Sequence, residues 1–162
     1  MTEDTGPSSG RTGRTETPEE RSDRNWNELL QELRVLQTGV QILTGFLLIL
    51  PFQSRFADLD TFQRDVYLVD VLVCLVTSGL FIAPVAIHRG LFRRSLKAEV
   101  VTLGDRLTRA GLLLLAVALS ATALLVFDVV LGRAQGLVVG GAVAVMLLGL
   151  WAVLPVVVRR RG

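Results

Sequence analysis

The hydrophobic residues of this chain are gathered in four long blocks, unlike the short amphipathic stretches of a soluble fold. The blocks cover residues 35–52, 66–87, 110–131 and 137–158. Each is close to the roughly 20 residues that an α-helix needs to cross the hydrocarbon core of a bilayer. We therefore expect an all-α membrane protein, in which residues 25–162 form one domain, a four-helix transmembrane bundle.

The first block is the least apolar of the four, because polar residues form a stripe along one side of the expected helix. The stripe occupies about a third of a turn on a helical wheel. Its members are Arg34, Gln37, Thr38, Gln41, Thr44 and Gly45. Amides and hydroxyls that face lipid lack hydrogen-bond partners, so the stripe should face protein or water. It is either a seam of interhelical hydrogen bonds or the lining of a polar pathway.

Two carboxylates lie inside the expected spans, Asp70 in the second and Asp128 in the third. We place both at a similar depth, about one turn below the outer surface, facing the bundle interior, where ionisable groups are functional candidates. If the two approach each other, charge repulsion and desolvation would favour protonation of one and create a proton-binding site. The alternative is pairing with Arg64 or Arg133, which would only anchor the helices.

Two further patterns follow helical spacing. One face of the second span collects Asp70, Cys74, Thr77, Phe81, Pro84 and His88. Around the fourth block, small residues recur at every fourth position, namely Gly132, Gly136, Gly140 and Ala144. Small residues at this spacing let helices approach closely, either within one chain or between two copies in a homo-oligomer.

Basic residues beside the spans predict the orientation, because cytoplasmic loops of membrane proteins carry an excess of Lys and Arg. The loop 88–109 contains Arg89, Arg93, Arg94, Lys97, Arg106 and Arg109, and three arginines follow the last block. The other two loops contain only Arg55, Arg64 and Arg133. We therefore expect both termini in the cytoplasm of a multi-pass cell-membrane protein (N-in/C-in), with interfacial basic residues facing anionic lipid at the inner leaflet.

Local signals set the expected helix boundaries. Asn25 as a cap and Glu28 reaching back predict the start of the first helix, which leaves residues 1–24 as a disordered cytoplasmic tail. In the loop 88–109, apolar residues share one helical face: Phe92, Leu96, Val100, Leu103 and Leu107. They predict either an amphipathic helix on the inner leaflet or an extension of the third span.

Composition excludes several classes of function. With one cysteine, Cys74, and one histidine, His88, the chain can form no internal disulfide and has no metal-ligand cluster. We find no catalytic or nucleotide motif, so we expect no enzyme and no cofactor. The net charge of +2 lies mostly in loops beside the spans and does not indicate nucleic-acid binding. Lys97 is the sole lysine among many arginines, which suggests a GC-rich bacterial source.

The chain resembles a known family in several stretches. They are ELLQELRVLQTGVQILTGFLLILPF, VYLV, IAPVAIHRGLFRR, LLVFDVVLG and a WAVLP ending, and the similarity covers residues 27–160. The family comprises small four-span membrane proteins of high-GC Gram-positive bacteria and is classed as a domain of unknown function. The resemblance implies the four-span fold and carries no established activity, although some members bear an automatic sodium:proton antiporter label.

Two functional hypotheses follow. The first is a non-enzymatic membrane component that acts by helix packing, as a homo-oligomer or an accessory subunit. The second is a small proton- or cation-coupled transporter or channel, for which the polar stripe and the two carboxylates argue. Against transport, no span is broken by paired Gly and Pro at its middle, and no internal repeat is evident.

Overall fold

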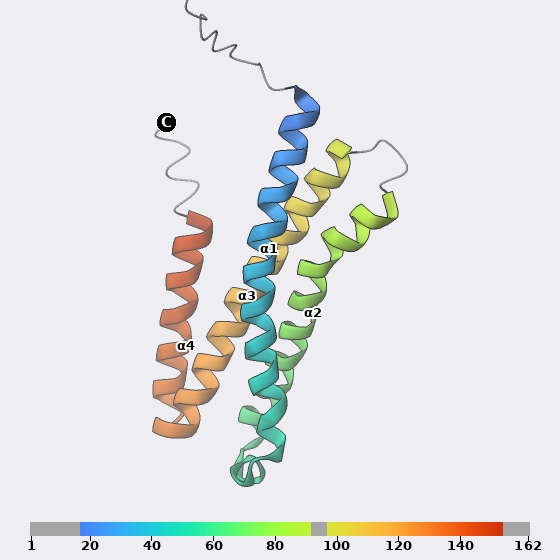
Figure 1. Ribbon diagram of the computed structural model, residues 1–162. Helices are drawn as coiled ribbons and strands as arrows, with labels where there is room; N and C mark the ends of the chain where they lie inside the picture. Colours follow the sequence, from blue (N-terminus) through green and yellow to red (C-terminus); the bar gives the residue numbers. More distant parts are fainter. Residues whose placement is uncertain (1–16, 92–96, 154–162) are drawn as a thin grey trace, which may run out of the picture.

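The computed structural model describes residues 17–91 and 97–153, and within them the regular structure is helical throughout. Its long helices are α1 (Pro18–Ile49), α2 (Thr61–Leu91), α3 (Lys97–Leu131) and α4 (Arg133–Leu148). The short 3-10 turns η1 (Leu50–Phe52) and η2 (Ser54–Asp58) link α1 to α2, and a π-helical turn η3 (Gly149–Val153) follows α4. The α1–α2 and α3–α4 connections lie at one end of the molecule, here called the turn end (Figure 1). The opposite end, where α1 begins, is called the terminal end.

All four long helices are long and apolar enough to cross a membrane. The helical segments that meet this condition are Arg24–Phe52, Thr61–Ile87, Thr102–Leu131 and Arg133–Trp151. The number and order of the four expected spans are confirmed, and the expected ends at Phe52, Ile87 and Leu131 agree. Residues 154–158 of the fourth expected block lie outside the described residues.

Helices α1, α2 and α3 share one core, built from residues that recur at alternating steps of three and four. The buried residues of α2 are Tyr67, Asp70, Cys74, Thr77, Phe81 and Pro84. On α1, Trp26, Leu33, Val40 and Leu47 are buried at steps of seven. A period of 3.5 residues keeps one row on each helix facing its neighbours when helices pack at a small angle. The predicted face of the second span is therefore the face that α2 buries, as far as Pro84.

The corresponding row on α3 is made mostly of small residues, which lets bulky side chains of the other helices fill the space. A Cβ added to Gly111 would overlap the ring of Phe81. At Gly104, an added Cβ would lie 3.2 Å from Leu29 Cδ2 and 3.4 Å from the ring of Trp26. Because these glycines have no side chain, α1 and α2 sit close to α3 near the terminal end.

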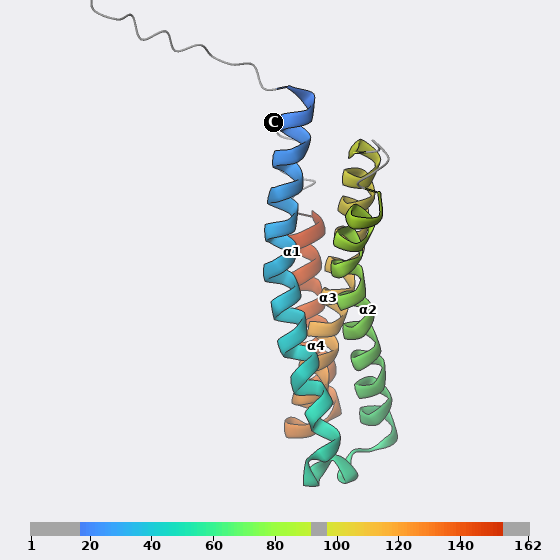
Figure 2. The same cartoon turned by 45° about the vertical axis from the view of Figure 1, so that its right-hand side comes forward.

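Helix α4 packs along α3 and makes no comparable contact with α1 or α2. Figure 2 shows α4 next to α3, behind α1. The chain turns between the two helices at Gly132, whose φ of 105° favours glycine. The arrangement is thus a three-helix core with α4 attached on the α3 side.

The predicted start of the first helix at Asn25 is wrong. Thr17 caps α1: its hydroxyl accepts a hydrogen bond from the Glu20 amide at 3.2 Å, and the Glu20 carboxylate accepts one from the Thr17 amide at 2.9 Å. Pro18 occupies the first helical position, where its missing N–H costs nothing. Residues 18–24, which we had assigned to a disordered tail, are therefore helical, and residues 1–16 lie outside the described part of the chain.

The helical segment expected in the loop 88–109 is, from Lys97 onward, continuous with the third span. Helix α3 runs unbroken from Lys97 to Leu131, which favours the second of the two alternatives for this segment. Its buried face in this segment contains Gly104 and Thr108, whereas Leu103 is 43% exposed. Two residues of the expected apolar face, Phe92 and Leu96, lie outside the described residues.

Candidate functional site

Asp70 is the most deeply buried acidic residue among those that the structure describes, with no solvent-exposed surface. Its Oδ2 accepts a hydrogen bond from Thr122 Oγ1 on α3 at 2.6 Å, and the thiol of Cys74 points to Oδ1 at 3.9 Å. Asp70 lies nine residues after Thr61, which puts it about 13 Å inside the turn end. Helix α2 begins five residues before the apolar block, so Asp70 lies about one turn after the start of the block and about two and a half turns after the start of the helix.

The groups around Asp70 are neutral. Tyr67 donates its hydroxyl to the Leu47 carbonyl oxygen at 3.1 Å, and Thr44 of α1 lies beside Cys74. Arg64, one of the expected partners, is exposed and donates to the Leu59 carbonyl oxygen at 3.3 Å. Within residues 17–91 and 97–153 no ion pair reaches Asp70. A carboxyl group in such a place needs a proton or a bound cation to offset its desolvation.

Asp128 has a different environment, at the junction of α2, α3 and α4. Arg133 Nε lies 2.7 Å from Asp128 Oδ2, a close charge contact without hydrogen-bond alignment, and Gln63 Nε2 donates to Oδ1 at 3.2 Å. The same guanidinium contacts Asp60 through Nη2 at 2.5 Å and lies 3.8 Å from the centre of the Phe62 ring. Asp128 therefore has one of the two expected pairings, the one with Arg133, which also links the start of α2 to the α3–α4 turn.

The two carboxylates do not form a joint site. Thr122, the residue that binds Asp70, lies six residues before Asp128 on α3, a distance of about 9 Å along the helix. Each carboxylate has its own hydrogen-bond partners, so the shared proton-binding site is not formed. The two carboxylates are therefore not at the same level, because Asp70 lies beside Thr122, about 9 Å from Asp128 along α3.

Three residues of the Arg133 bridge were not singled out from the sequence: Asp60, Phe62 and Gln63. A signal for two of them is present as a capping box, in which the Gln63 amide donates to Asp60 Oδ1 at 2.8 Å and the Asp60 amide to Gln63 Oε1 at 3.0 Å. The side chain of Gln63 therefore caps α2 with its oxygen and binds Asp128 with its nitrogen. Thr122 was not predicted either. Its only signal in the sequence is that it is a hydroxyl residue within an apolar block.

The polar stripe of α1 is divided between the core and the surface. Thr44 is buried against α2 and donates to the Val40 carbonyl oxygen of its own helix at 2.7 Å. Gln37 is half-buried, whereas Arg34, Thr38 and Gln41 are exposed, as is Gly45. The Thr38 hydroxyl bonds back to the Arg34 carbonyl oxygen at 2.9 Å. In the part of the chain that the structure describes, Gln37 and Gln41 make no hydrogen bond to another helix.

The row of small residues packs α4 against α3 within one chain. Gly136 and Gly140 are buried, and Ala144 is half-buried. A Cβ at Gly136 would lie 2.7 Å from Asp128 Cβ, and one at Gly140 would lie 2.7 Å from Leu124 Cβ. These glycines therefore position the backbone of α4 beside Asp128 and bring Arg133 within reach of it.

Of the four expected interfacial basic residues, the two that the structure describes lie toward the terminal end. Arg89 lies in the last turn of α2 and Lys97 is the first residue of α3. Arg93 and Arg94 lie outside the described residues.

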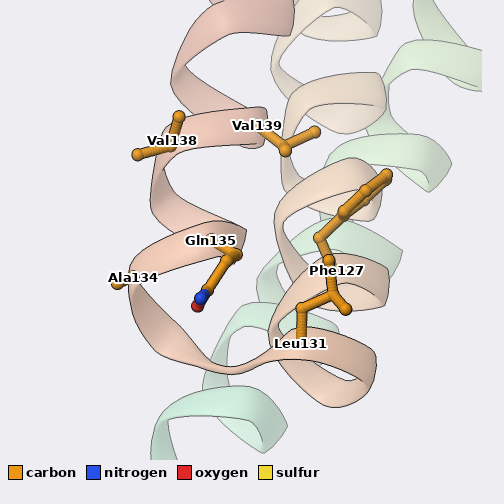
Figure 3. Close-up of a pocket in the computed structure, with 6 residues that line it drawn as sticks. All are labelled: Phe127, Leu131, Ala134, Gln135, Val138 and Val139. Atoms are coloured by element: carbon orange, nitrogen blue, oxygen red, sulfur yellow. The ribbon is translucent and has the colours of Figure 1, made fainter.

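A groove of about 310 Å³ lies between α3 and α4 near the turn end. It is lined by Phe127, Leu131, Ala134, Gln135, Val138 and Val139 (Figure 3). With its amide nitrogen toward the turn, Gln135 donates to the carbonyl oxygens of Leu131 at 3.2 Å and Gly132 at 3.3 Å, which satisfies the end of α3. The lining carries no charged group, and the surface suits a lipid chain better than a reacting substrate.

Fold and site together define a helical protein whose four long helices are suited to cross a membrane, with no cluster of three or more metal-binding side chains among the described residues. Residues 15–155 match the model of a family described as "Family of unknown function (DUF6328)". The chain belongs to this family. No curated protein and no solved structure matches it.

Proposed function

We propose that this chain is a non-enzymatic, multi-pass component of a cell membrane that works by associating with other transmembrane helices. Both termini lie in the cytoplasm in this proposal. The charge distribution supports that orientation: at the turn end, Arg133 contacts two aspartates and Arg64 bonds to backbone, while most of the other basic residues that the structure describes lie toward the terminal end.

The observation that carries the proposal is the exposed amide of Gln41. Gln41 lies eleven residues before Phe52, or about 16 Å from the turn end, which is close to the middle of a hydrocarbon core of about 30 Å. Its side chain is exposed and makes no hydrogen bond to another helix of the chain within the described residues. A lone amide in lipid would leave its donors and acceptor unsatisfied, at a cost of several kcal/mol per group. A partner helix that covers it removes this cost.

The association is tested by measuring the mass of the protein in lipid nanodiscs, and in parallel by recovering differently tagged copies from the native membrane. We expect either a complex of two or more copies or a stable complex with a second membrane protein. A protein that remains a monomer in nanodiscs and is recovered without any membrane partner would refute the proposal.

Asp70 favours a second candidate function, proton- or cation-coupled transport. A fully buried carboxyl group, whose only polar partners among the described residues are Thr122 and Cys74, is the arrangement that a reversible proton site needs. Transport predicts ion flux in liposomes that is lost in Asp70→Asn and kept in Asp128→Asn, whose Arg133 bridge serves structure. No flux above empty liposomes with folded wild-type protein would remove this candidate for the ions tested.

A further inference from the structure

Helix α1 carries a second row of residues at the spacing of a packing seam, in addition to the row that it buries. The steps along it are four, three, four, three and four residues, the same spacing as in the core rows of α1, α2 and α3. The row consists of Arg34, Thr38, Gln41, Gly45 and Leu48 on α1, continued by Phe52 in η1, and all six are exposed. It runs over nineteen residues, from Arg34 to Phe52, a rise of about 27 Å, which is nearly the full hydrocarbon thickness.

The middle of this row is shaped for close approach of another helix. Gly45 has no atom within 4 Å of the position that a Cβ would occupy, so the backbone is open there. The Thr38 hydroxyl is already bonded to its own helix, which leaves a small and satisfied surface. Between them, Gln41 presents an amide that donates two hydrogen bonds and accepts two. Small residues on either side of an amide are typical of helix contacts inside membranes.

We propose that two copies of the chain pair through this row of α1, about a twofold axis along the membrane normal, with Gln41 hydrogen-bonded to Gln41 of the second copy. This proposal rests on the association proposed above and names the partner. Copies inserted in the same orientation and related by such an axis place each residue opposite itself at the same depth. An amide is self-complementary in that position, because it is both donor and acceptor.

The two ends of the row are compatible with this pairing. The two Arg34 residues would meet at the cytoplasmic side, about 10 Å from Gln41 along the helix, where their long side chains reach the headgroup phosphates and separate. Phe52, 86% exposed at the turn end, lies at the opposite interface. The amide is therefore the one strongly polar group of the row that has to be satisfied within the hydrocarbon core.

Cysteine cross-linking in proteoliposomes tests the proposal, in a Cys74→Ser background. Thr38→Cys and Gly45→Cys lie on the row, whereas Val35→Cys and Ile42→Cys place a cysteine at similar depth on an exposed apolar part of the same helix. We expect oxidation to give covalent dimers at 38 and 45 and much less product at 35 and 42. Equal or greater cross-linking at 35 and 42 would overturn the proposed interface.

The role of the amide is tested by adding a second substitution to the Thr38→Cys reporter. Gln41→Leu should weaken self-association about tenfold, the loss of a reciprocal pair of interhelical hydrogen bonds. Gln37→Leu makes the same chemical change one turn away, off the row, and should leave the dimer yield unchanged. Equal yields in the two double variants would refute a Gln41 pair.

The failures are distinguishable from one another. A complex in nanodiscs without cross-links along the row would overturn this interface and leave the proposed association standing. A monomer without a partner from the native membrane would overturn both.

Discussion

Among the described residues, the bond from Thr122 to Asp70 is the only side-chain hydrogen bond that joins α2 to α3 in their apolar middle. Hydrogen bonds of this kind contribute about 0.6 kcal/mol on average and up to about 1.7. Thr122→Val should therefore lower the unfolding free energy by about that amount in a denaturant titration in mixed micelles. Asp70→Asn keeps an acceptor for Thr122 and should cost less. This assignment would be contradicted if Thr122→Val left the unfolding free energy unchanged while Asp70→Asn failed to fold.

At the turn end, substitution of Arg133 should lower the unfolding free energy more than substitution of any other residue. Removing it in Arg133→Met leaves Asp128 buried without its cation, and we expect a loss of about 2 kcal/mol, less than for a fully buried pair because Arg133 is 39% exposed. The double variant Arg133→Met with Asp128→Asn should recover most of that loss, as measured in the same titration. A double variant no more stable than Arg133→Met would show that the ion pair is not the cause.

The helix packing of α4 depends on Gly136 and has a matched control in Gly141. A Cβ at Gly136 would lie 2.7 Å from Asp128 Cβ and 2.8 Å from the Leu124 carbonyl oxygen, so Gly136→Ala has to push α4 away from α3. We expect it to lower stability by about 1–3 kcal/mol. At Gly141 nothing lies within 4 Å, so Gly141→Ala should be neutral or stabilising by up to about 1 kcal/mol in a thermal unfolding series. Equal effects at the two positions would contradict the packing described here.

At the scale of elements, the sequence predicts the spans well and their surroundings less well. The number of helices follows from block length alone, and the ends at Phe52 and Leu131 coincide with Pro51 in η1 and with Gly132. The start of α1 was missed because two capping patterns compete, and the one at Thr17 and Glu20 lies in a polar stretch without apolar periodicity. The extension of α2 back to Thr61 was not predicted, because residues 61–65 are too polar to count toward the block.

The candidate site could be predicted only in part, for a related reason. The spacing of Asp70, Cys74, Thr77 and Phe81 predicts which face of α2 is buried, because the residues that share a helical face depend only on the sequence of that helix. The contacts of Asp70 with Thr122 and of Gln63 with Asp128 depend on the relative heights of α2 and α3, which no spacing within either helix determines. The packing of Gly136 within one chain could not be predicted either, because it depends on where α3 lies relative to α4.

At the scale of the whole molecule, the orientation in the membrane is open to a direct test. With both termini in the cytoplasm, a cysteine at Ser54 in the turn end should react with a membrane-impermeant maleimide on intact cells. A cysteine at Ser22 near the start of α1 should react only after the membrane is permeabilised, in the same Cys74→Ser background. The reverse pattern would place the termini outside and contradict the orientation drawn from the basic residues.

The proposed function requires that the exposed polar row of α1 is covered in the membrane, whatever covers it. Spin labels at Thr38→Cys, on the row, and at Val35→Cys, 71% exposed in the single chain, report this through collisions with oxygen dissolved in the lipid. We expect the label at 38 to be shielded from oxygen and the label at 35 to be freely accessible. Equal, high accessibility at both positions in the reconstituted wild-type background would show that the row faces lipid and that the helix has no partner.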